Sequence, residues 1–206
     1  MRRLLCSILA IALLSSVAFT SPATIYDKLG VSRPSVAVIT SIPQPYQSKD
    51  IRQFIIEKME QKLTPDKYKQ YIGDVVATQA REYAERHRVI SLSQFNKDFL
   101  VGFGREYRYD YVVYLAFEPA TSNVGGGGLS VSVKQEMLLR GRVVDVANDK
   151  SLYDLDIIEK GGSSSVPALF GGAPSWEKAR KEAIGKALDE FNSRVDIPLV
   201  VPKPAE

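Results

Sequence analysis

Tyr109-Asp110-Tyr111-Val112-Val113-Tyr114-Leu115-Ala116-Phe117 is the stretch of sequence that decides the fold. β-Branched and aromatic residues fill most of it, which predicts a β-strand. A shorter apolar run, Val36-Ala37-Val38-Ile39, follows Pro34 and is typical of a strand that is buried on both faces. The two runs together predict a buried sheet at the centre of the protein.

The segments on the C-terminal side predict an antiparallel meander and a final helix. The four glycines Gly125 to Gly128 indicate a flexible hairpin loop, and Leu129 to Val146 reads as a long strand with a bulge near Leu138-Leu139. Asn148-Asp149-Lys150 turns that strand into another one from Ser151 to Glu159. Ser175 is positioned to cap a last helix, whose apolar stripe runs from Trp176 to Val195.

The segments on the N-terminal side predict three helices and one strand. The expected elements are a helix from Lys49 capped by Ser48, a second helix that starts at Thr64-Pro65-Asp66 and runs to Tyr83, a strand from Arg88 to Leu92, and a short helix that Ser93 caps and Gly102 and Gly104 end. A helical crossover makes the first two strands parallel.

The resulting order is β-α-α-β-α-β-β-β-α, which predicts an α/β (α+β) fold. It consists of a single mixed β-sheet of about five strands, with the helices packed on the sheet. We expect one domain over residues 35–195, preceded by a tether over 24–34 and followed by a Pro-rich tail over 196–206.

Composition places the chain among ordinary folded proteins. Its 206 residues hold 27 Lys and Arg, 24 Asp and Glu, and 45% hydrophobic residues, which argues against a disordered, collagen-like or multi-span membrane protein. The N-terminus has the pattern of a signal peptide: basic Met1-Arg2-Arg3, the apolar run Leu4 to Leu14, and then small residues. We expect residues 1–23 to be removed by cleavage after Ala23 or Ala18. The other reading is an uncleaved membrane anchor.

Cleavage would change both charge and redox chemistry. Residues 1–23 hold two Arg and no acid, so 25 basic and 24 acidic residues would remain, a net charge of +1. This charge does not favour nucleic acid or anionic lipid as a partner. Cys6 would be removed as well, leaving no cysteine for a disulfide. An exported protein without disulfides indicates the bacterial envelope, with the periplasm, the cell surface and full secretion all left open.

The residues with possible chemistry do not form a recognised site. His87 is the only histidine and is expected to lie exposed at a helix end, so neither a histidine mechanism nor a zinc site is predicted. Asp145, Asn148, Asp149, Asp154 and Asp156 surround one turn; they could bind calcium, but a solvated hairpin is the preferred interpretation. We therefore assign no catalytic, cofactor-binding or metal residues, and no cofactor.

Three other segments are candidates for binding. The glycine run lacks the Lys-Ser/Thr of a phosphate loop, and the basic and aromatic run from Arg105 to Tyr111 is interpreted as an aromatic ladder at a sheet edge. Segment 161–174 holds the apolar residues Val166 to Phe170 between glycines. It either covers the domain's own core, or it docks a partner or touches a membrane. Because the loops of a meander meet at one end of a sheet, the loops 119–128 and 161–174 should be neighbours. The 41–48 loop should lie at the same end of the sheet.

The element order and four short phrases carry a family resemblance: Val36 to Ile39, Val89 to Ser93, Tyr109 to Val113, and Arg142-Val143-Val144-Asp145. Over residues 35–195 the chain resembles the bacterial envelope α/β domains typified by the N-terminal domain of TolB and by CsgG- and LpoB-like proteins. It departs from them in lacking a lipobox cysteine and a following propeller, and in its helical insertion around 64–87.

The resemblance implies a protein that works by protein–protein contact and not by catalysis. We therefore predict an exported envelope binding or assembly module, whose partner is another envelope protein, with no membrane span after signal cleavage. A sheet edge or the loop face would make the contact. The alternative is an extracytoplasmic hydrolase that uses paired carboxylates.

Overall fold

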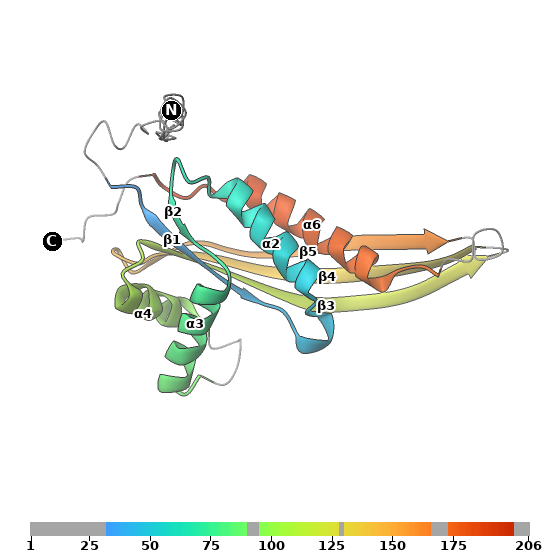
Figure 1. Ribbon diagram of the computed structural model, residues 1–206, viewed down its shortest axis with the longest axis horizontal. Coiled ribbons are helices and arrows are strands. Elements are labelled where there is room, and N and C mark those ends of the chain that lie inside the picture. The colour runs from blue at the N-terminus through green and yellow to red at the C-terminus, as the bar shows by residue number, and fades with distance from the viewer. Residues whose placement is uncertain (1–31, 90–94, 128–129, 166–172, 200–206) are drawn as a thin grey trace, which may run out of the picture. The chain divides into compact units, whose positions relative to one another are not determined.

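A computed structural model describes residues 32–89, 95–127, 130–165 and 173–199 (Figure 1). The predicted signal peptide and most of the predicted tether lie outside these ranges, as do Val166 to Phe170. The elements in chain order are β1 (Ser35–Ser41), a 3-10 turn η1 (Gln44–Tyr46), α2 (Lys49–Lys62), β2 (Lys69–Tyr71), α3 (Asp74–Arg86), α4 (Lys97–Tyr107), β3 (Tyr111–Gly127), β4 (Ser130–Asp145), β5 (Lys150–Ser165) and α6 (Trp176–Arg194).

The predicted fold class is confirmed. One mixed sheet has the strand order β2-β1-β3-β4-β5, and helices pack on it (Figure 1). β1 is parallel to both β2 and β3, whereas β3, β4 and β5 form the predicted antiparallel meander. The run that begins at Tyr111 is the central strand, and it is buried as far as Phe117. Its apolar character on both faces is explained by helices above and below it.

The sheet has a hydrophobic cluster on each face. Tyr111, Val113, Leu115 and Phe117 of β3 point to the first cluster, which includes residues of α2 and α6. Val112, Tyr114 and Ala116 point to the second cluster, which includes residues of α3 and α4. This division follows from the alternation of side chains along a strand. The first cluster includes Ile197, two residues beyond the predicted domain boundary.

The segment between α2 and α3 differs from its prediction. The predicted helix from Thr64 to Tyr83 is instead a turn at Thr64, the short strand β2, and a helix that starts only at Asp74. Tyr68 is drawn inward because its hydroxyl donates to the Ile197 carbonyl at 2.6 Å. Gly73 has a φ of 88°, a backbone conformation that favours glycine and separates β2 from α3.

Several smaller expectations were wrong. The strand predicted from Arg88 does not form at Arg88 or Val89, since Arg88 has a φ of 55°; residues 90–92 lie outside the described ranges. Asn96, and not Ser93, caps α4 through the N–H of Phe99. The register irregularities fall at Pro119/Thr121 and Val143/Val144 instead of Leu138-Leu139. The caps Ser48 and Ser175 are confirmed.

Candidate functional site

The far ends of the meander form the candidate binding surface. We call residues 119–127, 130–133 and 161–165 the tip ribbon. Gly125 to Gly127, which were predicted to lie in a loop, belong to it, because β3 continues through Gly127 and pairs with β4 as far as Ser130; Gly128 lies outside the described ranges. Val131 pairs with both Gly126 and Ser165, so the segments at 119–128 and 161–165 are neighbours as predicted, but as strands. The 41–48 segment does not join them, because Ser41 ends β1 beside Ala116.

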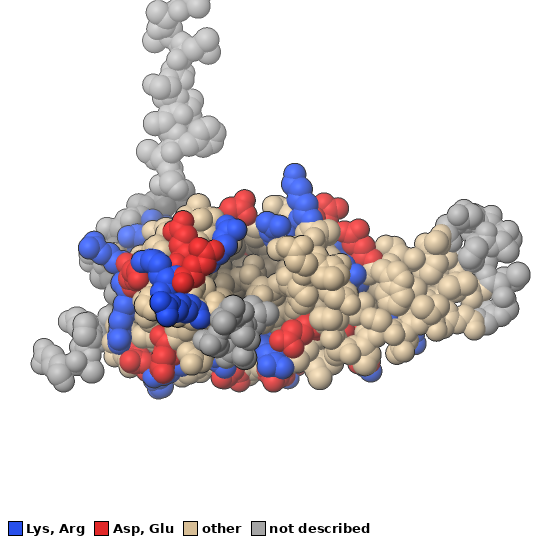
Figure 2. All heavy atoms as spheres, turned by 90° about the horizontal axis from the view of Figure 1, so that it is seen from below, with Lys and Arg blue, Asp and Glu red and all other residues tan. Residues whose placement is uncertain are grey.

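The tip ribbon contains no charged residue. Sequence ranges 119–133 and 161–175 together hold 30 residues without Lys, Arg, Asp or Glu. At the chain's average of 25% charged residues, 30 residues would hold about seven. In Figure 2 the charged side chains gather over the other half of this face, and the strand ends are uncharged surface. This pattern could have been read from the sequence.

The part of the tip ribbon that belongs to β3 does not pack against a hydrophobic core. Residues 120–126 are all exposed, although the neighbouring residues 111–117 of the same strand are all buried. Val124 is 69% exposed, and its cross-strand partner Val133 is buried. Figure 1 shows the three strands continuing beyond the helices. Exposed strand residues without a buried face add little to stability in water, so a surface that covers residues 120–126 of β3 would add to it.

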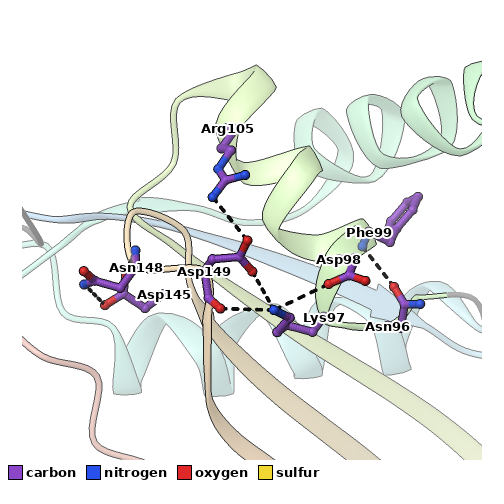
Figure 3. A network of polar contacts seen from close by, with 8 residues as sticks. All are labelled: Asn96, Lys97, Asp98, Phe99, Arg105, Asp145, Asn148 and Asp149. Atoms are coloured by element: carbon purple, nitrogen blue, oxygen red, sulfur yellow. Dashed lines mark hydrogen bonds and ion pairs between the residues drawn. The ribbon is translucent and has the colours of Figure 1, made fainter. Parts of the chain in front are cut away.

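The acids of the predicted turn are held by different partners (Figure 3). Asp145 accepts hydrogen bonds from the backbone N–H and the side-chain amide of Asn148, at 3.0 and 2.8 Å. Asp149 lies 2.6 Å from the Lys97 ammonium and 3.4 Å from the Arg105 guanidinium. Asp154 pairs with Arg142 at 2.8 Å. Within the described residues, no group of three or more acids, His or Cys is placed to hold a metal ion.

The Lys97–Asp149 pair gives a pH- and salt-dependent prediction. The hydrogen bond from Lys97 holds the pKa of the Asp149 carboxyl below its ordinary value of 3.8. The pair's stabilisation is therefore present above about pH 4 and is lost as the pH falls through the lowered pKa. We expect Asp149→Asn, which suits a φ of 53°, to lower the thermal midpoint at neutral pH in low salt and to have little effect in about 1 M salt. Glu60→Gln is the control, because Glu60 is an exposed acid of α2 that forms no ion pair with a described residue. Equal effects of both variants would contradict the prediction.

The other candidate residues from the sequence, His87 and the run from Arg105 to Tyr111, have structural roles. His87 is exposed at the end of α3 as predicted, with its ring 4.2 Å from that of Tyr83. The run from Arg105 to Tyr111 was expected at a sheet edge, but it leads into the central strand. Tyr109 is buried there and donates to Gln79 at 2.6 Å.

A groove of about 630 Å³ lies between α2 and α6. The hydrolase alternative requires two carboxylates that meet in such a groove. Its aromatic lining residue is Phe54, with Lys58 and Lys181 over the ring at 5.8 and 4.9 Å. Two of its acids are bound to lysines at 2.7 Å: Asp189 to Lys58, and Glu182 to Lys186. The other two acids of the groove, Asp50 and Glu177, form no ion pair with a described residue, and Glu177 accepts a hydrogen bond from the Ser48 hydroxyl at 2.8 Å.

No family model and no curated protein matches the chain. Solved structures with a similar arrangement include a hypothetical protein of Chlamydia trachomatis, with 15% identity, a TM-score of 0.41, and coverage of 79% of this chain and 95% of that one. A lipoprotein of Neisseria meningitidis has 12% identity, a TM-score of 0.40, and coverage of 79% and 99%. The C-terminal domain of LpoB from Salmonella enterica has 12% identity, a TM-score of 0.32, and coverage of 63% and 84%. In the part of the chain that the structure describes, no helix is both long and apolar enough to span a membrane.

Proposed function

We propose that the protein is exported into the bacterial cell envelope and acts there as a non-catalytic binding or assembly module. Its partner is another envelope protein, which contacts the tip ribbon. The carrying observation is that an ordered three-stranded surface is uncharged and, on β3, exposed along its length. Export rests on the signal-peptide pattern of residues 1–23, with cleavage after Ala23 or Ala18.

The composition of the tip ribbon suits a protein contact. Covering it desolvates no charge, so the large free-energy cost of burying an unpaired ion does not arise. Val124 would lose its exposure to water, which is the favourable apolar contribution. Gly125 and Gly126 have no side chains and let a partner backbone approach the strand closely.

Two valines with nearly equal exposure allow a matched test. Val124 is 69% exposed on the tip ribbon, and Val75 is 66% exposed on α3. We expect Val124→Asp to reduce crosslinking to the envelope partner at least about tenfold, because a charge then enters a surface that the partner desolvates. Val75→Asp should leave the crosslink unchanged, and both variants should keep nearly the same thermal midpoint.

The measurement is crosslinking in intact cells with a C-terminal tag, followed by mass spectrometry of the captured protein and of the bait's N-terminus. A recurrent envelope protein lost only in Val124→Asp supports the proposal, as does a bait N-terminus near Thr24. Retention of the same partner by Val124→Asp, or equal loss in both variants, would show that the contact lies elsewhere.

A further inference from the structure

The outer edge of β5 from Asp154 to Gly162 is a second surface, which overlaps the tip ribbon only at Gly161 and Gly162. β5 is the last strand in the sheet order. The Lys160 carbonyl accepts a hydrogen bond from the Lys186 ammonium at 3.0 Å, and the Gly162 N–H donates to the Glu182 carboxylate at 3.1 Å. Both partners are side chains of α6, so the backbone groups of these even-numbered residues point away from β4.

The same alternation leaves part of this edge open. Backbone groups alternate in direction along an antiparallel strand, so those of Asp154, Asp156 and Ile158 also point outward. No residue in the described ranges hydrogen-bonds to them. A run of outward N–H and C=O groups is a template for pairing with another strand.

The side chains on this edge are self-complementary. Ile158 is a large apolar residue on β5, and it is 59% exposed to solvent. Asp156 and Lys160 flank it on the same face, two residues away on either side. Asp154 is bound to Arg142, whereas Asp156 forms no ion pair within the described part of the chain.

We propose that β5 pairs antiparallel with β5 of a second copy, about a two-fold axis at Ile158. Each Ile158 then packs against its copy, and each Asp156 faces Lys160 of the other copy, so two opposite-charge pairs flank the apolar contact. Cross-strand pairs of this kind are the units that stabilise a sheet. The two sheets would join into one, with the two-fold symmetry typical of dimers.

Neighbouring registers fit less well. An axis at Asp156 places two carboxylates opposite each other, and an axis at Lys160 places two ammonium groups opposite each other. An axis at Ile157 sets the exposed Ile158 against Asp156 and uses the carboxylate of Asp154, which Arg142 already binds. The Ile158 register instead places the two exposed Ile158 side chains together and sets Asp156 opposite Lys160, whose ammonium also contacts Glu136 of its own copy at 2.5 Å.

Helix α6 regulates access to this edge. In the paired state the Lys160 carbonyl and the Gly162 N–H bond to the second copy, so Lys186 and Glu182 must release them. Lys186→Ala removes a competitor for the Lys160 carbonyl, and we expect it to tighten the dimer.

Cysteine crosslinking tests the register directly. In a Cys6→Ser background, Ile158→Cys should form an intermolecular disulfide on mild oxidation, since facing residues of an antiparallel pair lie about 5.5 Å apart between Cα atoms, within disulfide reach. Asp154→Cys is the control on the same edge, because its two copies lie eight residues apart in this register, or about 27 Å. A monomer at about 100 µM by sedimentation, or equal crosslinking at both positions, would overturn the proposal.

A charge exchange tests the pairing independently of the crosslink. Asp156→Lys and Lys160→Asp each turn two attractive pairs into two repulsive ones, and each should raise the dimer dissociation constant at least about tenfold. Because Glu136 pairs with Lys160 in its own copy at 2.5 Å, the exchange is made with Glu136→Gln in every variant. In that background the double exchange should restore most of the affinity, and failure to restore it would refute the register. Purified protein suffices for these measurements, and all these residues lie outside the tip ribbon. Loss of the dimer and loss of the envelope partner are thus separate results.

Discussion

Gly161→Ala is expected to lower the free energy of unfolding by about 3 kcal/mol. Gly161 lies on β5 where α6 crosses the strand, and a Cβ atom there would stand 1.9 Å from the Ala179 carbonyl oxygen and 2.6 Å from the Ala183 nitrogen. Both alanines are fully buried, so the obstruction is the helix backbone and not a side chain that can rotate away. Either α6 must move off the sheet or β5 must bend.

Gly162→Ala is the matched control for this substitution. A Cβ atom at Gly162 would meet its nearest neighbour, the Val133 carbonyl oxygen, at 3.7 Å, which is ordinary contact. We expect its free energy of unfolding to change by less than about 1 kcal/mol. Urea denaturation of both variants measures the difference. If Gly161→Ala lost no more stability than Gly162→Ala, the close approach of α6 to β5 would be wrong.

Alkaline pH is expected to destabilise the protein through two central tyrosines. Burial raises the pKa of Tyr111 to about 12, with Asp145 and Asp110 adding to the rise, and burial raises the pKa of Tyr114 to about 12, with Glu118 adding to it. Their side chains are 1% and 5% exposed. A raised pKa means that the folded state keeps its protons longer than the unfolded state, whose tyrosines titrate near pH 10.

The stabilisation is therefore complete below about pH 10 and is lost as the pH rises from 10 to 12. Each shift of about two units corresponds to about 2.7 kcal/mol, so we expect the free energy of unfolding to fall by about 5 kcal/mol over this window. Urea denaturation at stepped pH, with tyrosinate absorbance recorded in parallel, measures it. Tyr114→Phe should remove about half of the loss, and an unchanged pH profile in that variant would contradict the assignment.

The sequence was most informative where a pattern is local. The run from Tyr111 to Phe117 was predicted as a strand from its β-branched and aromatic residues, and it is apolar on both faces because it lies between two helical layers. Ser48 and Ser175 were recognised as caps because a cap depends only on the next three residues. The last helix was found from its apolar stripe for the same reason.

The elements that could not be predicted from the sequence depend on contacts between residues far apart in the chain. β2 is three residues long and has no pattern of its own; Tyr68 beside it is held by Ile197, 129 positions away. Gly125 to Gly127 were predicted to lie in a loop from their composition, whereas pairing with β4 keeps them in a strand. The absence of charged residues from the tip ribbon can be seen in the sequence, but the exposure of Val124 cannot.

The bond from Tyr68 to Ile197 also fixes a position for labelling at one end of the sheet. Tyr68 adjoins Lys69, which pairs with Ser35 at the start of β1, so Ile197 is held at the end of the sheet remote from the tip ribbon. Along β3 the tip ribbon begins at Pro119, eight residues beyond Tyr111, or about 27 Å. A fluorophore at Leu199, which is 40% exposed and follows Ile197 by two residues, would therefore stand well away from the candidate binding surface.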